Sequence, residues 1–413
     1  MDLYNDAKKI IDEAIKSALP DNAVKKALAG KNFGDKNIFL LAVGKAAWQM
    51  ANAAFKELGG RISGGMVITK HGYSGSSIGN LKIFEAGHPV PDADTYRATE
   101  EAVAMAESLG TGDILLFLIS GGGSALFEKP AIAPEELESI TSRLLSCGAD
   151  IVEINTVRKR LSTVKGGKFA ELCAPAEVFS VILSDVLGDS PDAIASGPAY
   201  PDSTTCADAI RVADKYNLPL SDSTRALLGV ETPKKLGNVE TVITGSVSLL
   251  CRSAEKTAAE LGYKPFVLTD MLCCEASQAG SFLGSIARMY VKTGEKLAFI
   301  AGGETVVKLT GDGKGGRNQE LALAAAEEIK GIEGVACFSV GSDGTDGPTD
   351  AAGGYTDWLT AAKLKEIGLT IPDVLNRNDS YNALKRTGGL IFTGPTGTNV
   401  NDLSVILING KEK

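Results

Sequence analysis

A glycine-rich stretch from Gly302 to Glu320 carries side chains suited to anion chemistry. Its last residues, with Arg317, Asn318 and Glu320, open an alanine-rich apolar segment that the periodicity predicts as a helix. Backbone N–H groups at a helix start, beside a guanidinium, can hold a phosphate or a carboxylate. We therefore expect anion binding in this stretch, with Gly315 and Gly316 beside the ligand.

A lysine and a triple glycine follow two other apolar runs. Gly44-Lys45 comes directly after Ile38–Val43, and a glycine loop comes directly after Asp113–Ile119 and consists of Ser120, Gly121, Gly122, Gly123 and Ser124. Lys45 either meets a phosphate or carboxylate or is a solvated surface lysine. Three consecutive glycines exceed what a tight turn needs, which favours an anion cradle made of backbone amides.

Two acidic turns offer candidate Mg²⁺ ligands or a catalytic base. Asp185 and Asp189 lie four residues apart after the expected strand Val178–Leu183, and helix capping explains one of them but not readily both. A second acidic loop carries three aspartates among glycines, namely Asp343, Asp346 and Asp350. Magnesium ligation and a cluster of Asx turns are both open for this loop.

Two further stretches have weaker chemical signals. His88 lies in the proline-restricted turn Gly87–Asp92, where it is either a structural loop histidine or a ligand contact. Residues Asn155–Lys168 carry a basic face made of Arg158, Lys159, Arg160, Lys165 and Lys168. This face is either solvated or recognises a charged ligand.

Composition excludes several classes of function. The net charge of −9 and the scattered basic residues give no electrostatic support for nucleic-acid or membrane-surface binding. Seven cysteines without C-x-x-C spacing argue against a disulfide framework or structural zinc, and two histidines exclude a histidine-rich metal centre. The first residues are polar and no apolar run approaches a membrane span, so we expect a cytoplasmic protein.

Apolar runs alternate with amphipathic helical segments along the 413 residues, which are enough for two domains. We expect two three-layer α/β/α domains with an interdomain cleft: an N-terminal Rossmann-like domain (1–235) with a mainly parallel sheet, and a C-terminal domain (236–413) with a mixed sheet. The C-terminal segment could return to the first domain. Strand candidates Leu297–Ala301 and Thr305–Leu309 suggest a hairpin, and Asn155–Leu172 suggests one helix.

A set of motifs in a fixed order resembles the glycerate 2-kinase family whose C-terminal part is called the MOFRL domain. The resemblance spans nearly the whole chain and rests on GKAA at Gly44, GHPVPD at Gly87, ISGGGSAL at Ile119, NTVRKRLS at Asn155, LSDVLGD at Leu183, GGET at Gly302, GGRNQE at Gly315, DGTDGPTDAAG at Asp343 and GPTGTNVND at Gly394. Each motif is modest alone, and the ordered set is highly specific.

The resemblance implies ATP- and Mg²⁺-dependent phosphorylation of D-glycerate at its 2-hydroxyl. We also expect a monomer or a homodimer. It carries Lys45 and Arg317 over as the main functional cations, and we take Asp189 as the base. Asn399, in the last motif, joins the candidate cofactor-binding residues. Arg160 departs from the family, which more often has histidine there, so a role that needs an imidazole is in doubt.

Two other functions remain open on the sequence. The G-x-G-x-x-G at Gly311–Gly316 would suit an NAD(P)-dependent hydroxypyruvate reductase, although the segment before it is unlike a buried Rossmann strand. A non-enzymatic protein that binds small anions would explain the glycine loops but not the many aspartates. For the kinase, we expect Arg317→Ala to remove most turnover and leave the fold intact.

Overall fold

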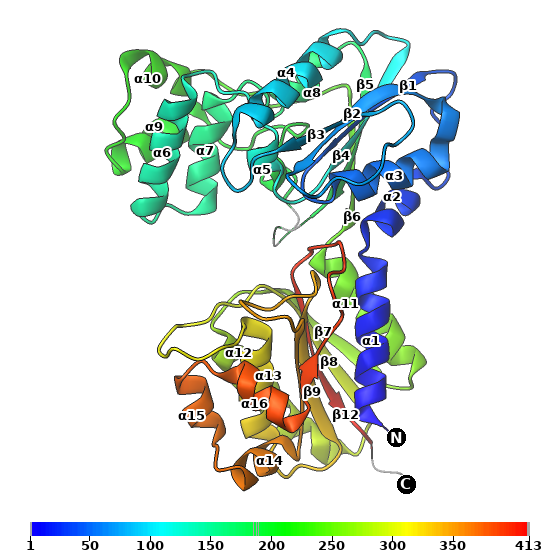
Figure 1. Ribbon diagram of the computed structural model, residues 1–413, viewed down its shortest axis with the longest axis vertical. Coiled ribbons are helices and arrows are strands. Elements are labelled where there is room, and N and C mark those ends of the chain that lie inside the picture. Colours follow the sequence, from blue (N-terminus) through cyan, green and yellow to red (C-terminus); the bar gives the residue numbers. More distant parts are fainter. Residues whose placement is uncertain (1, 185, 187, 189, 411–413) are drawn as a thin grey trace. The chain divides into compact units, whose positions relative to one another are not determined.

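The computed structural model describes residues 2–184, 186, 188 and 190–410. The chain divides into two compact units (Figure 1). Residues Pro20–Thr244 form what we call the parallel-sheet unit, and Met1–Leu19 with Gly245–Lys413 form the mixed-sheet unit. The division of the chain at 235/236 stays a prediction, and each unit is described by itself.

The sheet of the parallel-sheet unit has the strand order β3-β2-β1-β4-β5-β6. Its strands are β1 (Asn37–Val43), β2 (Ile62–Lys70), β3 (Lys82–Ala86), β4 (Asp113–Ile119), β5 (Glu177–Leu183) and β6 (Val239–Gly245). Its helices are α2 (Pro20–Leu28), α3 (Ala47–Leu58), α4 (Ala93–Glu107), α5 (Gly123–Leu126), α6 (Pro134–Ser146), α7 (Ile151–Leu161), α8 (Lys168–Leu172), α9 (Cys206–Lys215) and α10 (Asp222–Leu228), with 3₁₀ turns at Gly59–Arg61 and Ile194–Ser196.

Strands β1 and β4 are the centre of this sheet and pair in parallel, with Val43 opposite Ile119. Both are apolar and almost wholly buried, as expected for central strands covered by helices on both faces. The chain runs outward from β1 to β2 and β3 on one side and from β4 to β5 and β6 on the other. Ligands of open α/β sheets bind where the strand order reverses in this way.

The mixed-sheet unit has the strand order β11-β10-β9-β12-β8-β7. Its strands are β7 (Lys264–Leu272), β8 (Leu297–Gly303), β9 (Val335–Gly341), β10 (Gly353–Asp357), β11 (Leu390–Ile391) and β12 (Asp402–Ile408). Its helices are α1 (Leu3–Ser17), α11 (Val247–Glu260), α12 (Ala276–Tyr290), α13 (Arg317–Ile329), α14 (Thr360–Glu366), α15 (Ile371–Asn376) and α16 (Ser380–Thr387), with a 3₁₀ turn at Val291–Thr293.

The expected α/β class and the two kinds of sheet are confirmed, but the predicted hairpin is wrong. Thr305–Leu309 forms no strand, and Val306 makes only an isolated bridge to Glu275. The sheet is mixed because β7 and β8 pair in parallel, whereas β12 runs antiparallel between β8 and β9 and β10 runs antiparallel to β9 and β11. The predicted single helix Asn155–Leu172 is also wrong, since Gly166 and Gly167 adopt positive φ and separate α7 from α8.

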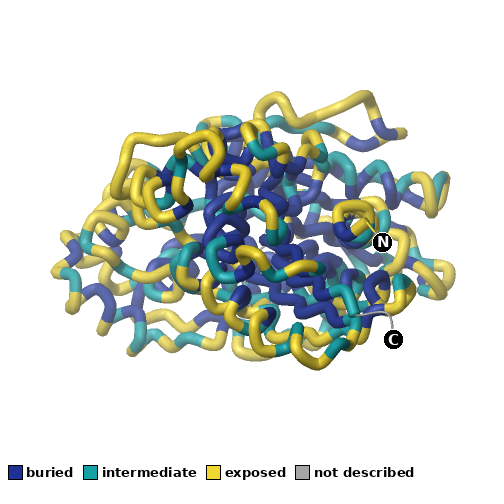
Figure 2. Tube along the Cα trace, turned by 90° about the horizontal axis from the view of Figure 1, so that it is seen from below, coloured by how far each residue is buried: buried dark blue, intermediate teal, exposed yellow. Residues whose placement is uncertain are grey.

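Helix α1 belongs to the mixed-sheet unit although it begins the chain. Its apolar side chains recur with helical spacing and are buried, and the hydroxyl of Tyr263 donates to Asp6 at 2.7 Å. Figure 2 shows the buried segments (dark blue) in the interior and exposed residues on the outer turns. No helix in the described ranges is long and apolar enough to cross a membrane.

Candidate functional site

The loops after β1 and β4 meet at the point where the strand order reverses. The N–H of Lys45 donates to the carbonyl of Gly121 at 2.9 Å, and the N–H of Ala46 donates to the hydroxyl of Ser120 at 3.1 Å. A Cβ at Gly44 would lie 2.2 Å from that hydroxyl, and the backbone there has φ +117°, so only glycine fits. Lys45 is thereby fixed beside the glycine loop.

The glycine loop presents backbone donors that the described part of the chain does not use. The N–H groups of Gly121 and Gly122 donate to none of the described residues, whereas that of Gly123 donates to the carbonyl of Ser120 at 3.3 Å. Helix α5 after the loop has only four residues, so its dipole adds little. Any attraction for an anion must come from these amides and from nearby side chains.

Lys70 and His88 lie at the same edge of the sheet, because β2 and β3 are parallel to β1 and end there. Lys70 is the last residue of β2 and pairs with Ala86, the last of β3, and His88 follows two residues later. The His88 ring and the Lys45 side chain come within 3.1 and 3.2 Å of the point that a Cβ of Gly122 would occupy. Lys45 and His88 therefore lie against the glycine loop, and Lys70 lies close enough to His88 for its charge to lower the pKa of that histidine.

This edge of the sheet lacks compensating carboxylates in the described part. Lys45, Lys70 and His88 form no ion pair with a described acidic residue, and Lys70 instead lies 5.0 Å from the ring centroid of Tyr73. Burial lowers the pKa of His88, and the charges of Lys45 and Lys70 lower it further. His88 is therefore a neutral hydrogen-bonding group near pH 7.

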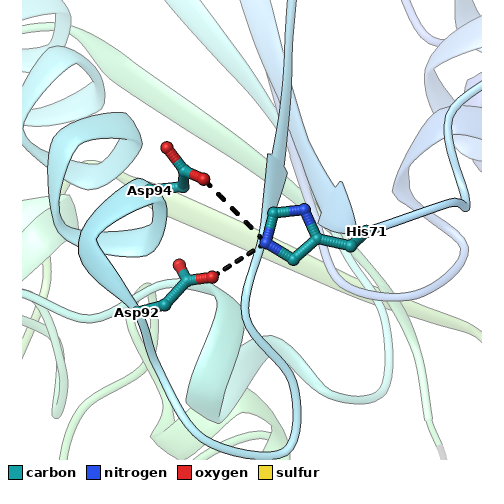
Figure 3. A group of neighbouring side chains, drawn as sticks. All are labelled: His71, Asp92 and Asp94. Carbon is teal, nitrogen blue, oxygen red and sulfur yellow. Dashed lines mark hydrogen bonds and ion pairs between the residues drawn. The ribbon is translucent and has the colours of Figure 1, made fainter.

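The turn that carries His88 is held by the other histidine. Figure 3 shows His71 pointing toward Asp92 and Asp94, with its Nε2 2.8 Å from Asp92 Oδ2. Asp92 also caps α4, because its carboxylate accepts the N–H of Thr95 at 2.9 Å. The hydrogen bond to Asp92 raises the pKa of His71. The Asp92 bonds join the end of β2, the Gly87–Asp92 turn and α4.

Buried polar groups support the far end of the glycine loop. The carbonyl of Ser124 accepts hydrogen bonds at 2.9 Å from both Arg158 and Lys165, and its hydroxyl lies 3.0 Å from that of Ser196. Burial lowers the pKa of Lys165 to about 8, although Glu128 lies 3.5 Å away. Of the predicted basic face, Arg158 and Lys165 therefore hold the loop in place.

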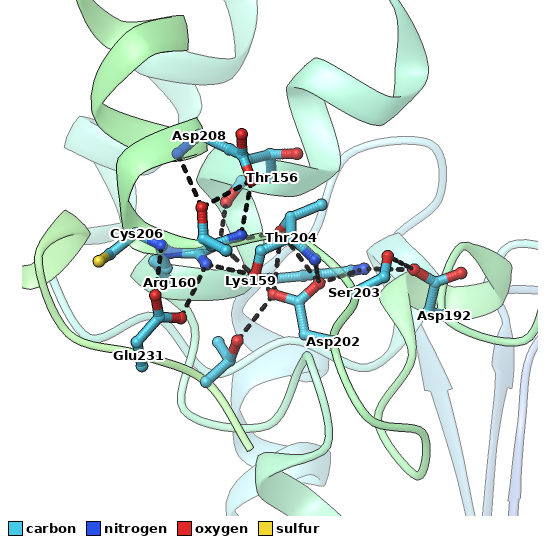
Figure 4. Close-up of polar contacts among 12 residues, drawn as sticks. Thr156, Lys159, Arg160, Asp192, Asp202, Ser203, Thr204, Cys206, Asp208 and Glu231 are labelled. Atoms are coloured by element: carbon cyan, nitrogen blue, oxygen red, sulfur yellow. Dashed lines mark hydrogen bonds and ion pairs between the residues drawn. The ribbon is translucent and has the colours of Figure 1, made fainter. Parts of the chain in front are cut away.

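Lys159 and Arg160 serve a structural network within the parallel-sheet unit (Figure 4). Both pair with Asp202, at 3.0 and 3.4 Å, and all three side chains are almost completely buried. Arg160 also donates to the carbonyl of Thr204 at 2.8 Å. Arg160 therefore binds the carboxylate of Asp202 within the fold. Lys168 donates to backbone carbonyls in the same region.

In the mixed-sheet unit, the start of α13 lies beside the ends of three strands. Arg317 Nε and Nη2 donate to the two carboxylate oxygens of Asp402 at 2.5 and 3.0 Å, and Nη1 lies 3.1 Å from Glu304. Asp402 begins β12 and pairs with Gly303 and Gly341, the last residues of β8 and β9. Arg317 is therefore a compensated cation, although 34% of its side chain is exposed.

Asp346 occupies the N-terminus of α13. Its carboxylate accepts the N–H groups of Asn318 and Gln319 at 3.1 and 2.9 Å, which are the donors that a bound anion would otherwise use. Burial raises the pKa of Asp346 to about 6 even though these hydrogen bonds oppose the shift. Burial would lower the pKa of Arg317, but its hydrogen bond and ion pair with Asp402 raise it.

The other residues predicted to bind cofactor in this unit lie in packed surroundings, with one exception. Asn318 accepts from Ser339 at 2.6 Å, and Glu320 accepts from Asn378 at 3.3 Å. Cβ atoms at Gly315 and Gly316 would lie 2.1 Å from Ser380 and 2.3 Å from Asp346. Asn399 is exposed. Contact of these residues with a cofactor stays a prediction.

The predicted Mg²⁺ ligands do not gather where the structure describes them. Asp343 accepts the N–H of Thr345 at 2.9 Å, which is an Asx turn, and Asp350 accepts from the hydroxyl of Tyr381 at 2.7 Å. Asp185 and Asp189 lie outside the described residues. Among those residues, His71, Asp92 and Asp94 are the group of three side chains with ligand atoms within 4.8 Å of one another. Mg²⁺ binding by the predicted aspartates stays a prediction.

Two family descriptions match the chain: "Domain of unknown function (DUF4147)" over residues 6–229 and "MOFRL family" over residues 297–402. A D-glycerate 2-kinase of Thermotoga maritima is 50% identical over 97% of each chain. The chain belongs to the glycerate 2-kinase family. A crystal structure of glycerate kinase from Thermotoga maritima, also 50% identical, has a TM-score of 0.95 and covers 98% of this chain and 99% of its own.

The chain is also similar to a protein with a different name. A putative hydroxypyruvate reductase of Agrobacterium vitis is 37% identical over 97% of this chain and 93% of its own. That name corresponds to the enzymatic alternative left open by the sequence.

Sequence reasoning missed three residues that the fold places at the two sheet edges: Lys70, Glu304 and Asp402. Glu304 and Asp402 are in the family motifs GGET and GPTGTNVND, so their positions in these motifs could have indicated them. Lys70 has no such signal, because only the parallel pairing of β2 with β1 and β3 brings it to Lys45 and His88.

Proposed function

We propose that this protein catalyses ATP-dependent phosphorylation of D-glycerate to 2-phosphoglycerate. The observation that supports this most directly is the position of Lys45 and the Ser120–Ser124 loop at the reversal of strand order in the parallel sheet. An oxyanion there would meet free backbone amides and an unpaired ammonium within the described surroundings. The family membership adds the identity of the substrate.

Lys45 would neutralise charge on an oxyanion held by the amides of Gly121 and Gly122. Phosphoryl transfer depends mainly on positioning and on charge stabilisation, which suits a rigid loop with a fixed lysine. Arg317 would supply a second cation, either to the transferred phosphoryl group or to the glycerate carboxylate. To do so it must share its donors with Asp402 and Glu304.

The proposed cofactors are ATP and Mg²⁺. ATP supplies the phosphoryl group, and the free amides and Lys45 fit a phosphate. Mg²⁺ in kinases is usually held by one or two carboxylates together with phosphate oxygens, so it needs no complete protein cage. Asp185, Asp189, Asp343, Asp346 and Asp350 stay candidate ligands and Asp189 the candidate base. A cytoplasmic location and a monomeric or homodimeric state also stay predictions.

Hydroxypyruvate reduction is the second candidate, on the strength of the Agrobacterium relative's name. The local geometry gives it less support. The loop after β1 has one glycine in Gly44-Lys45-Ala46 and no G-x-G-x-x-G, and Gly311–Gly316 follows no strand. Cβ atoms at Gly311 and Gly313 would lie 2.5 and 2.4 Å from the Arg377 backbone, which accounts for these glycines by packing.

A coupled assay separates the candidates. The protein is supplied with D-glycerate and Mg-ATP, and enolase is added without phosphoglycerate mutase, so that only a 2-phosphorylated product is consumed. We expect phosphoenolpyruvate to form at once. Product that needs the mutase would contradict the proposed regiochemistry, and oxidation of NADH or NADPH with hydroxypyruvate but no transfer from ATP would favour the reductase. Ligand binding with neither reaction would indicate a non-enzymatic anion-binding protein.

A further inference from the structure

The sheet edge around the glycine loop contains more basic groups than Lys45. Lys70 ends β2 and His88 follows β3, and the parallel registers place both at the same edge of the sheet as the loop after β4. The ring of His88 lies against Gly122, at 3.1 Å from the position of a Cβ there. The side chain of Lys45 approaches the same point from its own strand.

We propose that Lys70 and His88 bind a substrate oxyanion together with Lys45 and the amides of Gly121 and Gly122. This inference rests on the proposed function and extends its binding site to two residues on β2 and on the Gly87–Asp92 turn. The oxyanion is either the carboxylate of glycerate or a phosphate of the nucleotide. Lys70 supplies charge, and His88 supplies a directed N–H donor.

The contacts of the two residues support binding rather than a structural role. Several buried cations of this unit have carboxylate partners, as Lys159 and Arg160 have Asp202, and Lys168 instead donates to three backbone carbonyls. Lys70 and His88, both half-buried, have no such partner in the described ranges. Burial lowers the pKa of His88, and the nearby charges of Lys45 and Lys70 lower it further, as expected where positive charge is concentrated.

The backbone around His88 is held firmly enough to aim its ring. The N–H of Gly87 donates to the hydroxyl of Thr95 at 3.2 Å, and Asp92 binds both Thr95 and His71 (Figure 3). The N–H of His71 donates to the carbonyl of Ala86 at 3.2 Å. His71 is therefore a positioning residue for the turn, and His88 is the group that meets the ligand.

Steady-state kinetics of Lys70 variants give the first test. Lys70→Met should raise KM about tenfold to a hundredfold for one substrate, since it removes one charge-assisted hydrogen bond, and Lys70→Arg should restore most of the affinity. A selective rise for D-glycerate identifies the carboxylate as the ligand, and a selective rise for ATP identifies the phosphate. The matched control is Lys82→Met, because Lys82 begins β3 at the opposite end and pairs with Glu101. Lys70→Met kinetics equal to those of Lys82→Met would overturn the proposal.

Histidine NMR of the wild-type protein gives a test that does not depend on the folding of a Lys70 variant. The chain has two histidines, so histidine labelled with ¹³C at Cε1 gives two ring signals, which His71→Gln assigns. D-Glycerate, Mg-ATP and inorganic phosphate are added separately. We expect the His88 signal to shift with at least one of them and the His71 signal to stay nearly constant. An unchanged His88 signal with all three would overturn the proposal even if the Lys70 variants failed to fold.

The two proposals can fail separately. If the coupled assay detects no transfer from ATP to glycerate, the proposed function is wrong, but a His88 shift with inorganic phosphate would still support an oxyanion site. If transfer occurs and neither Lys70→Met nor the His88 signal responds, the kinase stands and the extended site is wrong.

Discussion

Basic side chains lie at one edge of each sheet, but the two edges differ in whether those side chains have carboxylate partners. In the parallel-sheet unit, Lys45, Lys70 and His88 meet at strand ends with no carboxylate partner within the described chain. In the mixed-sheet unit, Arg317 is held by Asp402 and Glu304, close to the buried Asp346. Within the described residues, the first edge has basic groups without carboxylate partners, whereas the second has its cation already compensated.

This difference shows that a cation and a helix start do not by themselves leave backbone donors free for an anion. The start of α13 has both, but Asp346 already accepts the N–H groups of Asn318 and Gln319. The Ser120–Ser124 loop has only a four-residue helix behind it, but its amides remain unused by the described residues. The availability of the donors separates the two edges.

Lys45→Met should have the largest effect on activity if the first edge binds the reacting anion. We expect kcat/KM to fall about 10³-fold, since a preorganised charge in the site is lost. Stability should change little, because Lys45 has no ion-pair partner among the described residues. Steady-state kinetics and urea unfolding measure both quantities, with the exposed Lys56→Met on α3 as the control. Wild-type kinetics in Lys45→Met would show that the edge of the parallel sheet does not bind the reacting anion.

Arg317→Met should affect both activity and stability. We expect kcat/KM to fall about 10²-fold, and we expect a loss of about 2 kcal/mol because the buried Asp402 would lose its partner. The ion pair therefore changes the expectation that the fold of an Arg317 variant stays intact. Thermal unfolding and kinetics check this.

A double variant separates the two roles of Arg317. Arg317→Met with Asp402→Asn should regain part of the stability and none of the activity. Arg288→Met is the matched control, since Arg288 on α12 forms a largely exposed pair with Glu328 on α13, and its loss should cost under about 1 kcal/mol. Recovery of activity in the double variant would reduce Arg317 to a structural residue.

Asp346→Asn should change the pH dependence of stability. The pKa of Asp346 is raised in the fold to about 6, so its contribution is present at low pH and is lost as pH rises through 6. We expect ionisation of Asp346 to lower the stability of the wild-type protein by about 1.4 kcal/mol between pH 5 and pH 7. Asp346→Asn should flatten this dependence of stability on pH. Urea unfolding across this range measures it. Asp350→Asn, which alters an exposed carboxylate with a lowered pKa, should leave the slope unchanged.

Gly122→Ala should have the smallest effect and tests the packing of His88 on the loop. The residue has φ +83°, so alanine costs about 1 kcal/mol, and its Cβ would push against the His88 ring. We expect a KM rise of about threefold to tenfold. Gly112→Ala, where a Cβ meets nothing within 4 Å, is the control. Equal behaviour of the two variants would show that the contact does not matter.

The sequence by itself determined the class of the fold, the family and the two strand-end loops. Continuous apolar runs such as Asp113–Ile119 fix central strands, and the glycines after them fix tight turns, because these preferences are local. The ordered motifs identified the family. The hairpin at Thr305–Leu309 was misjudged because strand pairing depends on partners distant in sequence, here β12 between β8 and β9.

Only the tertiary structure decided which charges are available. Arg160, Lys165 and Arg317 appear in the sequence as equivalent basic residues, but Asp202, Glu128 and Asp402 compensate them in the fold. Lys45, Lys70 and His88 are separated along the chain and become one group because parallel strands end at the same edge. Coulomb interactions depend on distance in space and on burial, and neither is encoded in local sequence.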